Sequence, residues 1–141
     1  MSDVFSNAKR SWVMSRVRTR HTEPERLVKK LLHSAGYHVA LHVKDLPGRP
    51  DLVVRARKTA IYVHGCFWHR HASCDKGRRR PKTRAKFWSE KLGSNVARDR
   101  RVARQLRRNG WHVVTIWECE TENEERLRQR LRRLLGSLAG H

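Results

Sequence analysis

Apolar residues recur at helical spacing near the start and the end of this chain, and at strand-like spacing between. A helix is predicted to begin at Thr22, because Thr22 and Glu25 have the spacing of a capping box, and to end at Gly36. A second amphipathic helix is predicted over residues 123–138, where leucines recur every three or four positions. Each of these helices should bury one face.

The pattern between the two helices predicts strands and a further helical region. Residues 37–43 alternate between apolar and polar, as in a half-buried strand, and a turn follows at residues 46–50. Two short apolar runs on either side of a basic tip predict a strand pair. The helical region should break near Gly93, and a buried strand should follow it. These last elements are predicted at residues 52–54, 60–63, 83–108 and 113–117. The order predicts an α/β fold, a single domain with a mixed β-sheet flanked by helices.

The charge of the chain narrows the class of partner. There are 33 Lys and Arg residues against 13 Asp and Glu, which gives a formal net charge of +20. Counterion release from phosphates rewards many basic side chains, so nucleic acid is the first candidate partner. On charge alone, a nucleoid or ribosomal-type protein without chemistry is an equally good explanation. Residues 1–21 carry several arginines without steady periodicity, and we interpret them as a basic N-terminal arm before a domain of residues 22–141.

The apolar runs also bear on the compartment. None approaches the roughly 20 residues that a membrane helix needs, and the N-terminus lacks the hydrophobic core of a secretory signal. We therefore expect a cytoplasmic protein without a membrane partner, associated with the nucleoid if its source is bacterial. In a reducing compartment, clustered Cys and His are better explained as metal ligands than as disulfides.

Three cysteines and several histidines predict a metal site. Cys66 and Cys74 lie in an irregular, His-rich segment, and Cys119 directly follows the last predicted strand. A structural Zn²⁺ takes four thiolate or imidazole ligands, so His69 or His71 would complete the set. The spacing does not decide between these two histidines. The alternative is three unrelated cysteines, because the gap before the third is not that of a zinc finger.

Candidate catalytic groups are few in so basic a chain. Asp51 begins a predicted strand directly after Pro-Gly-Arg-Pro, where a carboxylate can hold Mg²⁺ against a scissile phosphate. An Asp that only caps the turn would give the same pattern. Glu25 is either the capping partner of its helix or a group that polarises water at the metal. His64 and His69 are candidate proton-transfer groups, because imidazole titrates near neutral pH.

Phe67 and Trp68 lie among these polar residues. On a rigid loop of a DNA-binding protein, such side chains can insert between base steps and bend the duplex. Burial of both rings under the loop is the alternative, and periodicity alone favours it.

Several motifs resemble those of the very-short-patch (Vsr-type) DNA mismatch repair endonucleases. The similarity runs in order from about residue 14 to residue 119, and its most specific part is the run His-Gly-Cys-Phe-Trp-His with the distant Trp-Glu-Cys. The motifs are Gly-Arg-Pro-Asp at 48–51, His-Gly-Cys-Phe-Trp-His at 64–69, Phe-Trp-x-x-Lys-x-Gly-x-Asn-Val-x-Arg-Asp at 87–99, Gly-Trp-x-Val at 110–113 and Trp-Glu-Cys at 117–119.

The resemblance implies a fold, an activity and two metals. The fold would be similar to the restriction-endonuclease core, although the Glu-x-Lys of that superfamily is absent from residues 61–64, as it is in the very-short-patch family. The enzyme would nick one strand of double-stranded DNA beside a T·G mismatch that deamination of 5-methylcytosine leaves. It would use Mg²⁺ for catalysis and Zn²⁺ for structure, and we expect a monomer because nicking one strand needs one active site.

The same resemblance implies roles for the candidate catalytic residues. Asp51 and the backbone carbonyl of Val63 would hold Mg²⁺, and His69 would be the general base with His64 and Glu25 in support.

It also implies the zinc ligands and the DNA-binding residues. His71 would join Cys66, Cys74 and Cys119 on zinc. Phe67 and Trp68, with Met14 from the arm, would open the duplex, and Lys91 and Asn95 would read the mismatch and its neighbours.

Two other functions stay open at this point. One is a related nuclease with a different mismatch or site specificity, and the other is a non-catalytic, zinc-stabilised DNA-binding module. The unusually basic segment 75–82 could alter which flanking bases are read, or only add phosphate contacts.

Overall fold

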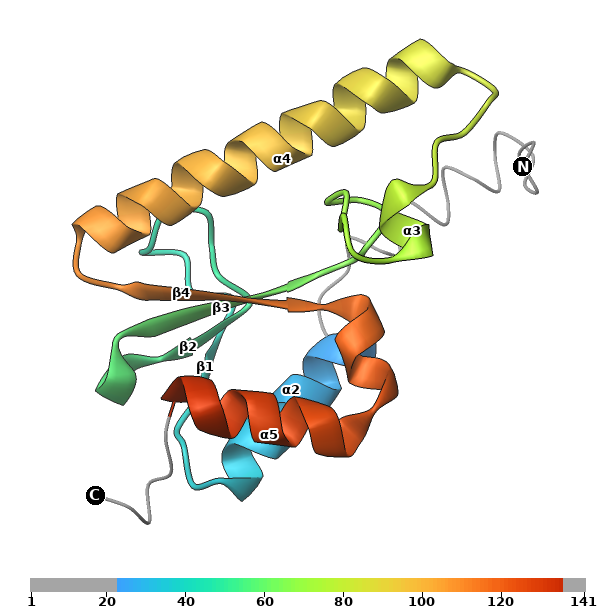
Figure 1. The fold of residues 1–141 in the computed structure, drawn as a ribbon. Helices are drawn as coiled ribbons and strands as arrows, with labels where there is room; N and C mark the ends of the chain where they lie inside the picture. The colour runs from blue at the N-terminus through green and yellow to red at the C-terminus, as the bar shows by residue number, and fades with distance from the viewer. Residues whose placement is uncertain (1–22, 136–141) are drawn as a thin grey trace.

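The computed structural model describes residues 23–135, which form a four-stranded sheet with helices on both faces (Figure 1). Helices α2 (Glu23–Ser34) and α5 (Glu124–Leu135) lie on one face, and α4 (Ala85–Arg108) crosses the other. The predicted α/β fold with a mixed sheet flanked by helices is therefore confirmed. The predicted arm, Met14 within it, and the predicted cap at Thr22 lie outside the described residues.

The sheet has the strand order β1-β2-β3-β4. The first two pairings are antiparallel, and β3 and β4 are parallel. Because parallel neighbours need a long crossover connection, the chain between β3 and β4 has room for both the His-rich segment and α4. The strands are β1 (Ala40–Leu41), β2 (Leu52–Val54), β3 (Thr59–His64) and β4 (His112–Trp117).

Alternate residues of the sheet supply two apolar layers. Leu52 and Ile61 are paired in the register of β2 and β3, and both are fully buried in the main core with α2 and α5. Val53 alternates with Leu52, so it faces the side that α4 covers, and it is fully buried as well. Leu92 and Leu106 of α4 have no exposed surface. Burying one such side chain contributes roughly 1.5–3 kcal/mol, so these layers place α4 firmly over the sheet.

The first strand is shorter than the alternation at residues 37–43 predicts. Tyr37 is buried outside the strand, and its hydroxyl donates to the carbonyl of Leu135 at 2.9 Å, which ties the chain to the end of α5. His42 ends the strand on the other side, because its φ of 49° is in the left-handed region. The apolar residues of this segment are therefore partly buried without continuous pairing.

Helix α4 is continuous over 24 residues, so the predicted break near Gly93 is wrong. A glycine inside a helix costs about 1 kcal/mol, which is less than the burial of Leu92 beside it contributes. Asn95 strengthens the same stretch, because its Nδ2 donates to the carbonyl of Trp68 at 3.0 Å. Among residues 23–135, no helix combines the length and the apolar character that a bilayer crossing demands.

The remaining segments are short and lie between these elements. The basic tip of the strand pair forms the 3₁₀ helix η1 (Arg55–Arg57), and a second 3₁₀ helix, η2 (Glu118–Glu122), follows β4. Within the segment predicted to be irregular, residues 75–78 form the one-turn helix α3 (Asp75–Arg78).

Candidate functional site

A cavity of about 1230 Å³ opens between the sheet and α4. It is lined by the first turn of α2, the loop before β2, the end of β3 and the middle of α4. Residues that are far apart in the sequence meet here, including all the predicted catalytic positions: Glu25, Asp51, Val63, His64 and His69.

Asp51 lies immediately before β2 and is held by the neighbouring strand. The backbone N–H of Val63 donates to its Oδ2 at 2.8 Å. Two residues beyond the Leu52–Ile61 pair, the strand register places Pro50 opposite Val63. Proline has no backbone N–H, so it cannot donate a hydrogen bond to the carbonyl of Val63. Because the N–H and C=O of a strand residue point to the same side, the carbonyl of Val63 faces the edge where Asp51 lies. Asp51 and this carbonyl thus offer two oxygens in one place.

The surroundings of Asp51 make its charge unfavourable in the absence of a cation. Burial raises the pKa of Asp51 to about 6, the hydrogen bond from Val63 opposes that rise, and the nearby carboxylate of Glu25 adds to it. Glu25 is itself buried, with 5% of its surface exposed. Two buried carboxylates this close together are stabilised in their charged forms by a cation, and a divalent cation fits this set of donor atoms.

Two histidines and one carboxylate form a second group in the cavity. The rings of His64 and His69 are stacked, with centroids 3.7 Å apart and an angle of 6° between their planes. His69 Nδ1 lies 2.6 Å from Asp99 Oδ2, and His64 Nε2 lies 4.0 Å from Asp99 Oδ1. Burial lowers the pKa of His64 to about 3, with a further lowering from the charge of His69, so His64 is neutral at physiological pH.

The contact with Asp99 determines which nitrogen of His69 can act as a base. A carboxylate accepts a hydrogen bond from Nδ1–H, and this tautomer leaves the lone pair on Nε2. The stacked ring of His64 restricts the orientation of His69. This arrangement can accept a proton at Nε2 and stabilise the resulting imidazolium.

Asp99 and His42, which line the cavity and contact predicted catalytic residues, were not assigned a role from the sequence. Asp99 belongs to a motif, but its contact with His69 follows from the fold that brings α4 beside the loop after β3. His42 follows β1, and its Nε2 lies 3.3 Å from Glu25 Oε1. A carboxylate surrounded by arginines at 98, 100 and 101 was the available signal for Asp99. No pattern distinguished His42 from the chain's other histidines.

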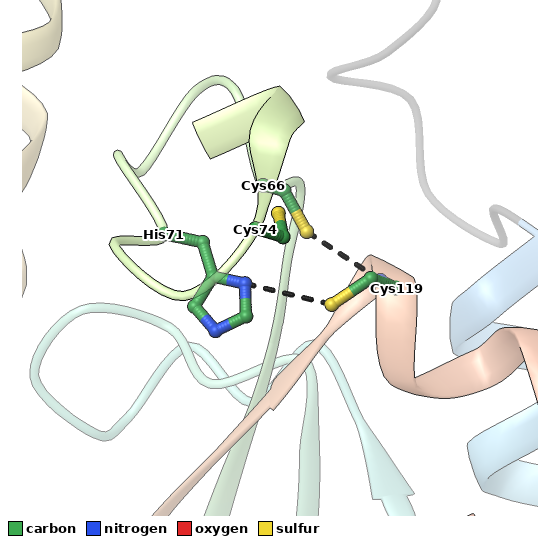
Figure 2. Close-up of side chains that lie close together, drawn as sticks. All are labelled: Cys66, His71, Cys74 and Cys119. Carbon is green, nitrogen blue, oxygen red and sulfur yellow. Dashed lines mark hydrogen bonds between the residues drawn. The ribbon is translucent and has the colours of Figure 1, made fainter. Parts of the chain in front are cut away.

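A second cluster, of Cys66, His71, Cys74 and Cys119, lies beside the end of β4 (Figure 2). Its ligand atoms all lie within 4.8 Å of one another. Figure 2 shows the side chains of Cys66 and His71 directed toward Cys119, which follows β4, with Cys74 beside Cys66. His71 Nδ1 lies 3.5 Å from the sulfur of Cys119. Tetrahedral Zn–S and Zn–N bonds would place two such atoms roughly 3.6 Å apart, so the cluster is compatible with a structural metal.

The loop is shaped around this cluster. The ring of His71 stacks on Trp117 of β4 with centroids 4.2 Å apart, and the backbone N–H of His71 donates to the carbonyl of Cys66 at 2.9 Å. A Cβ on Gly77 would lie 1.8 Å from the carbonyl oxygen of His71, so only glycine allows α3 to approach. Burial raises the pKa of Cys66 to about 12, and a bound metal would be needed to hold this sulfur as a thiolate.

Phe67 and Trp68 lie between Cys66 and His69 along the loop and are only partly buried. Their ring centroids are 5.3 Å apart, and both rings contact Trp88 of α4, at 5.5 Å from Phe67 and 5.7 Å from Trp68. Trp88 is 5% exposed and forms the base of this aromatic group. The two loop residues are thus neither fully in the core nor isolated on the surface, and they also line the cavity.

The two predicted base-reading residues lie on the cavity side of α4. Lys91 and Asn95 are one helical turn apart and both line the cavity. The amide of Asn95 is bonded to the carbonyl of Trp68, so it connects α4 to the loop that carries the aromatic pair. The predicted catalytic and DNA-binding residues within 23–135 therefore line one cavity, and the cluster of Cys66, His71, Cys74 and Cys119 is joined to it by the loop that carries Phe67 and Trp68.

Comparison with known proteins adds an independent finding. A family model described as DNA mismatch endonuclease Vsr matches residues 2–76. The chain is 45% identical over 135 residues to the Type II nicking enzyme V.XorIIP of Xanthomonas oryzae, covering 96% of this chain and 98% of the relative. It is 42% identical over 127 residues to the DNA mismatch endonuclease Vsr of Escherichia coli, covering 90% and 80% of the two chains. It is 41% identical over 135 residues to the Type II nicking enzyme V.NmeAIP of Neisseria meningitidis, covering 96% and 95%.

Proposed function

The chain belongs to the Vsr family of DNA mismatch endonucleases, and from this we propose that it nicks one strand of duplex DNA beside a T·G mismatch in a Mg²⁺-dependent hydrolysis. The observation that carries the proposal is the convergence of Asp51, Val63 and the His69–Asp99 pair in one cavity. Two of the relatives named above are nicking enzymes, which supports cleavage of a single strand. One such centre in a monomer suffices for that reaction.

The metal of the proposed reaction would be held by Asp51 and the carbonyl of Val63, with Glu25 beside them. When bound, Mg²⁺ would neutralise negative charge that develops on the scissile phosphate. Asp51 and Glu25 would bind and orient the ion, because their buried carboxylates gain from the positive charge. The backbone bond from Val63 holds Asp51 in one orientation for this role.

Proton transfer would be the task of His69. Asp99 holds the Nδ1 side of the ring, so Nε2 would accept a proton from the attacking water. The imidazolium that forms would be stabilised by the carboxylate of Asp99 at 2.6 Å. His64 would support the ring as a neutral, stacked neighbour, since burial keeps it unprotonated.

Recognition of the mismatch would use the loop and α4. Phe67 and Trp68 would insert into the base stack, with Trp88 supporting them from below. The Cys66 cluster would hold this loop in shape, and Zn²⁺ is the proposed ion because three thiolates and an imidazole are its usual ligands. Lys91 and Asn95 would read the mismatch, and Met14 would add to the wedge. The T·G substrate itself is proposed from the family to which the chain belongs.

The catalytic proposal is tested with a T·G duplex labelled differently on its two strands. The wild type should nick one strand when Mg²⁺ is added, and Asp51→Ala should not, although it should still bind the duplex. Asp45→Ala is the matched control, because Asp45 is an exposed carboxylate bonded to Arg55 and is not among the residues that line the cavity. Nicking by Asp51→Ala at the rate of the wild type would refute the assignment of the metal ligand.

The recognition proposal has a separate test. The double variant Phe67→Ala, Trp68→Ala should lose its preference for the mismatched over the matched duplex. Phe87→Ala is the control, because Phe87 contacts Trp88 but is 37% exposed on α4. If the double variant keeps the wild-type preference for the mismatched duplex, Phe67 and Trp68 only pack in the protein and do not recognise the mismatch.

A further inference from the structure

His42 lies next to the proposed catalytic carboxylates, Glu25 and Asp51. It lies outside the sequence motifs that carry the family resemblance. Its backbone N–H donates to the carbonyl of Asp51 at 3.0 Å, so the two residues are tied together directly. Its φ of 49° is a left-handed conformation that a residue with a Cβ adopts at a cost. Such conformations persist where the surroundings determine them strongly, and here the result is a side chain directed toward Glu25.

The side chain of His42 is enclosed with the two carboxylates. It is 15% exposed, and that of Glu25 is 7% exposed. One ligand atom from each of Glu25, His42 and Asp51 lies within 4.8 Å of the other two, and all three residues line the main cavity. The distance between His42 Nε2 and Glu25 Oε1 is 3.3 Å. Two atoms bound at right angles to one ion at about 2.1 Å would lie roughly 3 Å apart, so this spacing suits a shared cation.

We propose that His42 is a protein ligand of the active-site metal, so that one imidazole joins the carboxylates of Glu25 and Asp51 in a single cation position. The inference rests on the proposed function in one respect, that Asp51 holds a divalent ion. It goes beyond that function in adding a nitrogen ligand to a centre otherwise made of oxygens.

A nitrogen ligand changes which ions the centre prefers. Carboxylates and carbonyls suit Mg²⁺, whereas an imidazole raises the affinity for first-row transition ions. The centre should therefore bind Mn²⁺ more tightly than Mg²⁺, and the difference should depend on His42. A His42 that only pairs with Glu25 would leave this difference unchanged after substitution.

The test uses the full-length protein with its structural site loaded with zinc, and Mn²⁺ as the probe. Mn²⁺ is paramagnetic, and pulsed electron paramagnetic resonance detects a directly bound imidazole nitrogen by its hyperfine coupling. The wild type should show this coupling. His42→Gln keeps a polar side chain of similar reach and should lose the coupling, with Mn²⁺ affinity lower by about tenfold and Mg²⁺ affinity, from competition, changed much less.

Two further variants separate the outcomes. His69→Gln removes another imidazole of the same cavity and should keep the coupling, and Asp51→Asn should abolish Mn²⁺ binding at this centre. Coupling that persists in His42→Gln, or that is absent from wild type with Mn²⁺ bound, would overturn the assignment of His42 while leaving Asp51 as the metal ligand. Mn²⁺ binding that survives Asp51→Asn, or fails in the wild type, would overturn the metal centre of the proposed function and this inference together.

Discussion

Replacing Asp51 with Asn should stabilise the protein at neutral pH in the absence of Mg²⁺, although the same change should abolish nicking. Burial raises the pKa of Asp51 from 3.8 to about 6, so the folded protein holds the charged carboxylate at a cost. Asn resembles the protonated carboxyl, and its Oδ1 can still accept the hydrogen bond that Val63 donates to Asp51 at 2.8 Å. The substitution therefore removes the charge and keeps the contact.

The size of the effect follows from the shift in pKa. A rise of about two units, at about 1.4 kcal/mol each, corresponds to at most about 3 kcal/mol of unfolding free energy. Because the pKa of Asp51 is higher in the folded than in the unfolded protein, the protonated carboxyl favours folding. The wild type has this part of its unfolding free energy in full below pH 3.8 and loses it as the pH rises through about 6. The variant does not titrate here, so its advantage should be largest above pH 6 and should disappear toward pH 4. At neutral pH it corresponds to roughly 10 °C in the thermal midpoint.

The assay is urea and thermal unfolding of zinc-loaded wild type and Asp51→Asn between pH 4 and pH 8. Added Mg²⁺ should stabilise the wild type as its binding saturates and should leave the variant unchanged, so the gap should narrow. Asp45→Asn, which removes an exposed carboxylate, should stay within about 0.5 kcal/mol of the wild type. Equal stability of wild type and Asp51→Asn at pH 7.5, or a gap that widens toward acid, would refute the reasoning.

Three further predictions concern the cysteine cluster, the proposed general base His69 and the contact of Arg98 with DNA. Cys74→Ser should lower the amount of bound zinc measured by atomic absorption and should lower the thermal midpoint by several degrees. Ser73→Ala, beside it, should change neither quantity. Full zinc occupancy in the cysteine variant would exclude Cys74 as a ligand. Asp99→Asn should lower kcat about a hundredfold or more with DNA affinity unchanged, because His69 loses the carboxylate 2.6 Å away, and an unaltered single-turnover rate would contradict this. Arg98→Ala should lower the slope of log Kd against log salt by about 0.9 if Arg98, at the cavity, neutralises one phosphate, and an identical slope would show that it does not.

The parts of the fold set by local pattern were predictable from the sequence. The leucine spacing of α5 requires burial of one helix face, and the continuous apolar runs of β2 and β3 require burial on both faces of the sheet. The structure places these elements as the pattern indicates. The continuity of α4 was not predictable, because it depends on the burial of Leu92 in the folded protein and on the hydrogen bond from Asn95 to the carbonyl of Trp68. Local propensity at Gly93 contained no information about either contact.

Some parts of the candidate site could likewise be predicted from the sequence and others could not. Asp51 after a proline turn could be proposed as a metal ligand, and Cys66 and Cys119 as members of one metal site, because few residue types provide such chemistry and these are rare in the chain. The contacts of Asp99 and His42 could not, since each depends on where a distant element lies. Asp99 reaches His69 only because α4 crosses the sheet, and His42 reaches Glu25 only because its backbone leaves β1 in a left-handed turn.

The most direct test of the central proposal is cleavage of a library of T·G duplexes with randomised flanking bases, with the cut position read on both strands. The account predicts a nick in one strand at a constant distance from the mismatch, only when Mg²⁺ is added, and no nick in the matched library. Cleavage of both strands, or nicking that ignores the mismatch, would contradict it.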